Sequence, residues 1–156
     1  MTAQIEERLI YRSERLGMST EPLNDFFTFG GSRPRFARTS TALWRNYIGT
    51  WEILNDRLYL IGLEATMMDG SPASLETVFP WYPDRVFAHW YSGELHVPRG
   101  ELLRYVHMGY SSTYEKSFIL DIANGVVTGT RIVENSIPDN QPDLKYDMVE
   151  FIRRKK

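Results

Sequence analysis

The side chains best suited to acid–base or metal chemistry gather between positions 89 and 107. All three histidines of the chain, His89, His96 and His107, fall there, together with Ser92 and Glu94. A serine, a histidine and a carboxylate within reach of one another can hydrolyse a bond, and two histidines can hold a metal ion. Which of these arrangements forms depends on how the chain turns.

A turn at Arg99-Gly100 is predicted to fold this stretch into a hairpin. If the turn has two residues, His96 and His107 share a face with the serine and the glutamate. If it also includes Pro98, His107 instead shares a face with the first histidine. No motif supports either site, because G-x-S-x-G and H-E-x-x-H are both absent. We therefore expect no catalytic residue, metal or other cofactor, and keep a small hydrolase or metal-dependent enzyme of the 86–107 hairpin as an alternative.

A second group of residues could contact phosphate. Arg33, Arg35, Arg38 and Arg45 lie in a stretch without acidic residues, and a basic patch beside aromatic rings can follow a single-stranded nucleic acid. The net charge of −2 gives no general attraction to such a polymer. Single-stranded nucleic-acid binding through the 33–45 arginines is therefore a second alternative, and nucleic acid is not the partner we expect.

The segment FPWYPDRVFAHWY, residues 79–91, is rich in aromatic rings. Its two prolines predict an aromatic loop at 79–84, since proline cannot donate to a central strand ladder, and a strand at 85–97 follows. In the strand, Phe87 and Trp90 are expected to pack in the core.

The aromatic loop itself has two interpretations. Trp81 and Tyr82 lie between prolines with Arg85 close by, and these residue types are enriched where proteins bind proteins. The alternative is a lid folded over the core. We predict that Trp81, Tyr82 and Arg85 contact a protein partner, with Arg33 and Arg35 as a possible neighbouring patch.

Several segments predict antiparallel hairpins that would position these side chains. Asn124-Gly125 and Asn55-Asp56 each interrupt alternating apolar runs and suit tight turns. The apolar run at 58–63 predicts a central strand. The stretch at 8–18 is predicted as a further hairpin, with a helix as its competitor, and the stretch at 40–47 as a short helix.

Loops are predicted at three clusters of turn-forming residues, and a last strand after the third. The loops are residues 29–36, 67–74 and 135–143, and the strand is residues 144–152. The pattern predicts a mainly β or α+β fold: antiparallel hairpins in a sheet, sandwich or partial barrel with one or two short helices. A length of 156 residues fits a single domain, residues 1–156.

Composition limits the remaining possibilities. The chain has no cysteine, which excludes disulfides and thiolate chemistry. The first residues are charged where a signal peptide would be apolar, and no run approaches the ~20 apolar residues of a membrane span. We expect a cytoplasmic protein without membrane contact.

Four stretches, STALWRNYIGTWEI, LYLIGLEA, VFAHWYSGELHVPRGELLRYVHMGY and YEKSFILDI, are similar to a family of small bacterial and phage single-domain proteins known mainly as uncharacterised open reading frames. The resemblance covers residues 40–125. It implies a bacterial or phage origin and a compact domain, and no catalytic residues come with it. A small fold without cysteine, metal-ligand spacing or a nucleophile motif leads us to expect a non-enzymatic protein-binding module, such as an immunity or regulatory protein.

Overall fold

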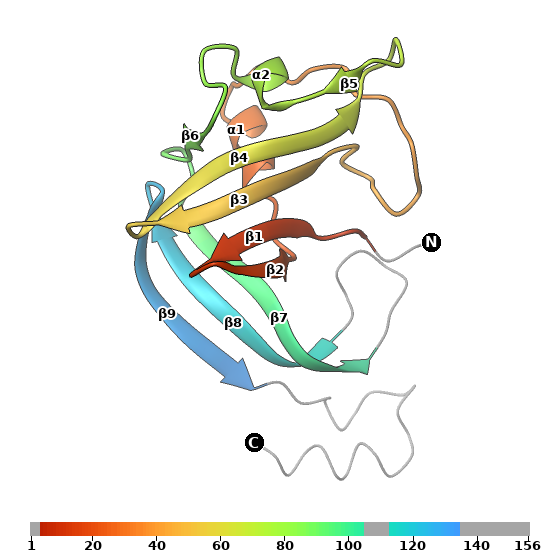
Figure 1. Cartoon of the computed structure of the whole chain (residues 1–156). Helices are drawn as coiled ribbons and strands as arrows, with labels where there is room; N and C mark the ends of the chain where they lie inside the picture. Colours follow the sequence, from red (N-terminus) through yellow and green to blue (C-terminus); the bar gives the residue numbers. More distant parts are fainter. Residues whose placement is uncertain (1–3, 105–112, 135–156) are drawn as a thin grey trace.

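The computed structural model describes residues 4–104 and 113–134, which form a mainly β structure (Figure 1). The chain starts with strands β1 (Glu7–Tyr11) and β2 (Glu14–Met18), followed by helix α1 (Pro22–Thr28). The next elements are β3 (Ile48–Leu54), β4 (Arg57–Thr66), β5 (Pro72–Ala73), helix α2 (Leu75–Val78), β6 (Val86–Phe87), β7 (Gly93–Arg104), β8 (Thr113–Ala123) and β9 (Val126–Glu134). The predicted fold class, mainly β with short helices, is confirmed.

The strands of the described segments form one mixed sheet in the order β2-β1-β3-β4-β9-β8-β7, with β5 and β6 attached to β4. Every pairing is antiparallel except that of β1 with β3, in which Arg8 lies opposite Thr50. The sheet is strongly curved, and the β1–β2 hairpin lies in the opening between β3 and β7 (Figure 1). Just after β2, the amide of Ser19 donates to the carbonyl of His96 in β7 at 2.9 Å. The curved sheet therefore brings its two outer strands together without closing into a barrel.

Two predicted hairpins are confirmed. In the β3–β4 turn, Asn55 and Asp56 have φ of 52° and 59°, and in the β8–β9 turn Asn124 and Gly125 have φ of 50° and 83°. Positive φ at both central residues is what a two-residue type I′ turn requires.

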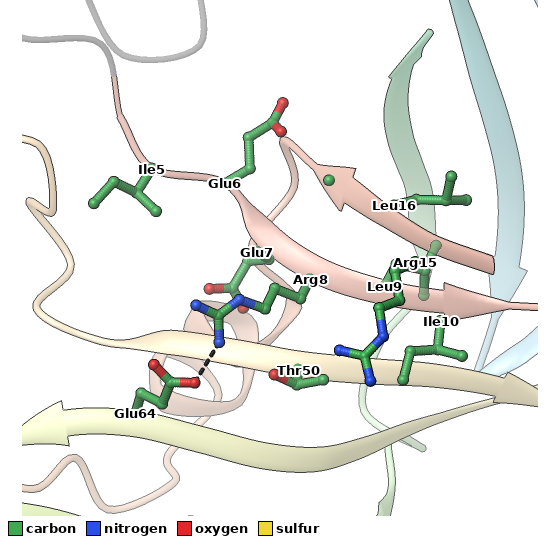
Figure 2. Close-up of a pocket in the computed structure, with 11 residues that line it drawn as sticks. Ile5, Glu6, Glu7, Arg8, Leu9, Ile10, Arg15, Leu16, Thr50 and Glu64 are labelled. Carbon is green, nitrogen blue, oxygen red and sulfur yellow. Dashed lines mark hydrogen bonds and ion pairs between the residues drawn. The ribbon is translucent and has the colours of Figure 1, made fainter. Parts of the chain in front are cut away.

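The N-terminal stretch is also a hairpin rather than the competing helix. Arg12 and Ser13 connect β1 to β2 with φ of 51° and 66°. A long-range ion pair secures this hairpin on the sheet, since Arg8 in β1 pairs with Glu64 in β4 across β3 (Figure 2). The parallel pairing of β1 with β3 had no counterpart in the sequence predictions.

Gly125 is confined by its neighbours as well as by its backbone angle. A Cβ atom there would lie 2.7 Å from the carbonyl oxygen of Ala88 and 2.8 Å from the ring of Phe87, whereas at Gly70, with φ of 90°, it would meet nothing within 4 Å. We expect Gly70→Ala to cost about 1 kcal/mol of unfolding free energy from backbone strain alone. Gly125→Ala should cost about 1–3 kcal/mol more, because it also overpacks the turn. Urea unfolding of both variants checks this; equal losses would contradict the close contact.

The predicted hairpin at 86–107 is wrong. β7 continues through positions 98–100 without turning and pairs along its length with β8. Of the predicted strand 85–97, Val86 and Phe87 form β6 and residues 93–97 begin β7, while residues 88–92 between them are not strand. Among the described strands, β7 pairs with β8 alone. Pro98 is therefore tolerated, because the N–H that proline lacks would lie on the unpaired side of β7, where no strand needs it.

The predicted helix at 40–47 is also wrong. The segment forms consecutive turns, in which the amides of Leu43 and Asn46 donate to Ser40 and Leu43. The amide of Trp44 donates instead to the side chain of Gln4 at 2.6 Å, so a contact with the N-terminal segment takes the place of a helical hydrogen bond.

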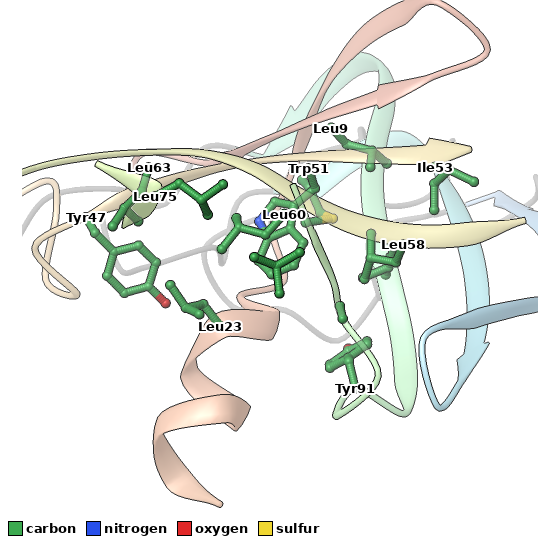
Figure 3. Close-up of a cluster of buried hydrophobic side chains, with 14 of the residues drawn as sticks. Leu9, Leu23, Tyr47, Trp51, Ile53, Leu58, Leu60, Leu63, Leu75 and Tyr91 are labelled. Atoms are coloured by element: carbon green, nitrogen blue, oxygen red, sulfur yellow. The ribbon is translucent and has the colours of Figure 1, made fainter. Parts of the chain in front are cut away.

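The core lies inside the curve of the sheet, where Trp51 is surrounded by leucines from β1, α1 and β4 (Figure 3). Leu58, Leu60 and Leu63 are buried while the alternate residues Tyr59 and Ile61 are half-buried, and β4 occupies the middle of the sheet as predicted. None of the helices in the described part of the chain has the length and apolar character of a membrane span. The predicted loop 135–143 and strand 144–152 lie outside the described residues.

Candidate functional site

The first residue of the aromatic loop, residues 79–84, is buried in the core. Phe79 is buried, with its ring stacked on Trp90 at 5.8 Å and 4.8 Å from the ring of Phe26 in α1. Its amide donates to Leu75 in α2, a residue that is itself buried. The start of the loop is thereby fixed against α1 and α2.

The next rings point away from that base. Trp81 is 84% exposed and Tyr82 is 54% exposed, and Trp81 is the most exposed large apolar side chain in the described residues. The amide of Tyr82 donates to the carbonyl of Phe79 at 3.0 Å, which closes a turn around Pro80. A short, hydrogen-bonded turn therefore presents two aromatic rings to solvent.

Arg85 follows the loop and is held over an aromatic ring of the sheet. Its guanidinium carbon lies 4.6 Å from the centre of the Tyr59 ring, and Tyr59 in turn contacts Phe87. Such stacking leaves the guanidinium edge free to donate hydrogen bonds. Phe87 and Trp90, predicted for the core, are half-buried, and the indole of Trp90 donates to the carbonyl of Pro22 at 2.8 Å.

Of the predicted neighbouring arginines, Arg33 contacts a different ring of α1 from the one that meets the aromatic loop. The guanidinium of Arg33 is 5.2 Å from the ring of Phe27 and donates to the carbonyl of Arg45 at 2.7 Å. Phe26, the preceding residue of α1, instead contacts the base of the aromatic loop. Arg35 is exposed beside the short β-bridge at Phe36. Arg33 and the base of the aromatic loop therefore contact neighbouring rings of α1, whose centres lie 5.8 Å apart.

The basic patch of the nucleic-acid alternative is incomplete. Arg45 is buried and donates to the carboxylate of Glu7 through Nε at 3.0 Å and Nη2 at 2.7 Å. Arg38 is exposed. Because Arg45 lies in the core, the expectation that it joins the other arginines on one surface is wrong.

The histidine site depends on the hairpin that does not form. Nε2 of His96 donates to the carboxylate of Glu94 at 2.9 Å, and Glu94 also pairs with Arg131. The hydroxyl of Ser92 accepts the amide of Asn124 at 2.9 Å, which ties it to the β8–β9 turn. His89 is exposed between the rings of its neighbours, and His107 lies outside the described residues. Within residues 4–104 and 113–134, no three His, Cys, Asp or Glu side chains gather as metal ligands would.

Sequence reasoning missed a buried carboxylate. Glu7 is fully buried in β1, where it accepts the amide of Gly49 and the indole N–H of Trp51, both at 2.8 Å, besides Arg45. Burial raises the pKa of Glu7, and the Arg45 charge opposes that rise. The available signal was the two-residue period of β1, which puts Glu7 on the face of the buried Leu9.

No family model, curated protein or solved structure matches this chain.

Proposed function

We propose that this protein is a non-enzymatic protein-binding module whose aromatic loop contacts the partner. The observation that supports this proposal is that Trp81 is 84% exposed while the base of its loop is buried between α1 and α2. A large ring held out on a fixed base buries area in a complex while losing little conformational freedom.

Arg85 completes the proposed contact. It lies three positions from Tyr82, and its stacking on Tyr59 keeps it oriented without an ion pair in the described residues. A partner with an apolar pocket flanked by a carboxylate would satisfy both the rings and the guanidinium. Arg33 and Arg35 form the neighbouring patch in the proposal, since Arg33 contacts Phe27, which lies beside Phe26 at the base of the loop.

In the cell, the module would act by occupying the surface of its partner, as an immunity or regulatory protein does. The resemblance of residues 40–125 to small bacterial and phage proteins favours an origin of that kind, and the absence of cysteine agrees with a cytoplasmic location.

The proposal is tested by capture from a lysate of the cell that produces the protein. Immobilised wild-type protein should retain one protein in stoichiometric amount, and the Trp81→Ala/Tyr82→Ala variant should not. Trp44→Ala is the matched control, since Trp44 is also exposed but lies in the 40–47 segment. Equal retention by wild type and the double variant would reject the aromatic loop as the contact.

A further inference from the structure

The β8–β9 turn carries the one asparagine of the chain that a glycine follows, Asn124-Gly125. The side chain of an asparagine can react with the backbone nitrogen of the next residue, and glycine hinders this reaction least because it has no Cβ. The Asn124 side chain is exposed, and within residues 4–104 and 113–134 no hydrogen bond holds its amide group. The group that would be attacked is therefore open to solvent.

The attacking group, the backbone nitrogen of Gly125, is held in the opposite way. Gly125 is buried, and its N–H donates to the carbonyl of Tyr91 at 2.8 Å. Its carbonyl accepts the amide of Leu58 at 2.8 Å, and the amide of Asn124 donates to the hydroxyl of Ser92 at 2.9 Å. Attack on the side chain needs the Gly125 nitrogen to lose its proton, and with it this buried hydrogen bond. The native turn thus withholds the nucleophile.

The packing around the turn opposes the reaction as well. A Cβ atom at Gly125 would lie 2.7 Å from the carbonyl oxygen of Ala88 and 2.8 Å from the ring of Phe87, so the backbone lies tightly against both residues. Ring closure requires rotation of the backbone at Asn124. Such rotation would move Gly125 against its neighbours or out of its two hydrogen bonds.

We propose that Asn124 is a modification site that the native fold keeps latent and that opening of the β8–β9 turn exposes. In the open turn, the Gly125 nitrogen gives up its proton and bonds to Cγ of Asn124, and the side-chain nitrogen leaves as ammonia. Water then opens the resulting five-membered imide at one of its two carbonyls. Opening at one carbonyl leaves aspartate at position 124, and opening at the other leaves isoaspartate, whose backbone runs through the side-chain carbon.

The two products differ in whether the turn can form again. Aspartate keeps the length of the backbone and accepts positive φ, so it can restore the turn. Isoaspartate inserts one backbone atom before Gly125, so the amide and the carbonyl of that glycine cannot both reach Tyr91 and Leu58. A transient opening of the turn would thereby become a permanent loss of its contacts with β4 and with the segment before β7.

The test is to incubate the full-length protein at mildly alkaline pH, with and without urea above the unfolding midpoint, and to follow Asn124 by peptide mass spectrometry. We expect conversion to be at least about tenfold slower in the folded protein, since a factor of ten corresponds to about 1.4 kcal/mol of opening free energy. Asn55, which aspartate follows in a turn of the same type, is the internal control and should convert more slowly than Asn124 in urea. Ser92→Ala removes the acceptor of the Asn124 amide, so it should speed conversion without urea and leave the rate in urea unchanged.

Conversion of Asn124 at equal rates with and without urea, or faster without it, would overturn the proposal, and this comparison needs the wild-type protein alone. The second step is checked by thermal melting after urea is removed. The isoaspartate fraction should melt below wild type, whereas Asn124→Asp should melt close to wild type. An isoaspartate fraction that melts like wild type would show that the turn accepts the extra atom, against the proposal.

Discussion

Replacing Glu7 with leucine is expected to lower the free energy of unfolding by about 3–5 kcal/mol, because the buried Arg45 would lose its hydrogen-bonded counter-ion and keep the longer contact with Glu21 at 3.8 Å. The side chains of Arg45 and Glu7 are 3% and 0% exposed, so water cannot replace the lost partner. The amide of Gly49 and the indole of Trp51 would lose their acceptor as well. Each buried donor left unpaired adds a further cost of about 1–3 kcal/mol.

Urea unfolding at neutral pH measures this loss, and the structure offers a matched control. Glu64→Leu breaks the exposed pair with Arg8, and such pairs contribute only about 0–1 kcal/mol. The double variant Glu7→Leu/Arg45→Leu should be more stable than Glu7→Leu alone, because it removes the buried charge that has lost its nearest counter-ion. A Glu7→Leu variant as stable as wild type would show that the carboxylate does not hold this region together.

The Glu7 cluster explains how the N-terminal hairpin is positioned. One carboxylate connects β1 to the 40–47 segment through Arg45 and to β3 through Gly49 and Trp51. Position 49 needs a glycine, since a Cβ atom there would lie 2.5 Å from the Glu7 carboxylate. The parallel pairing of β1 with β3 is thus fixed by a polar contact inside the core.

The features of the fold that could be predicted are those encoded locally. Asn55-Asp56 and Asn124-Gly125 specify their turns because few other residues adopt positive φ at both positions. Alternation of apolar residues then assigns the buried faces of the strands on either side.

The features that could not be predicted depend on contacts between distant segments. Pro98 resembles a turn residue, and only its place in an outer strand makes it acceptable within β7. The segment at 40–47 has helix-like spacing, yet Gln4 takes the amide of Trp44. Glu7 resembles a surface acid, and its partner Arg45 lies 38 residues away.

In the candidate site, too, some features follow from the local sequence and others from contacts between distant segments. The exposure of Trp81 and Tyr82 follows from the prolines around them, which keep the segment out of the sheet. The placement of Arg33 depends on its contacts with Phe27 of α1 and with the carbonyl of Arg45, which no local sequence pattern predicts.

Removing the indole of Trp81 is expected to leave the fold intact. A side chain that is 84% exposed contributes little to the core, so Trp81→Ala should change the unfolding free energy by less than about 0.5 kcal/mol. Trp51→Ala, the same substitution at a fully buried position, should cost about 3–5 kcal/mol. Comparison of the two melting curves distinguishes a contact surface from a lid over the core.

The most direct test of the aromatic loop is the affinity of Trp81→Ala for the captured partner, measured by titration calorimetry beside wild type and Trp44→Ala. We expect Trp81→Ala to bind roughly thirtyfold more weakly or worse, which corresponds to about 2 kcal/mol or more at a hot-spot aromatic. Trp44→Ala should bind like wild type. Wild-type affinity in a folded Trp81→Ala variant would contradict the account and place the contact elsewhere on the protein.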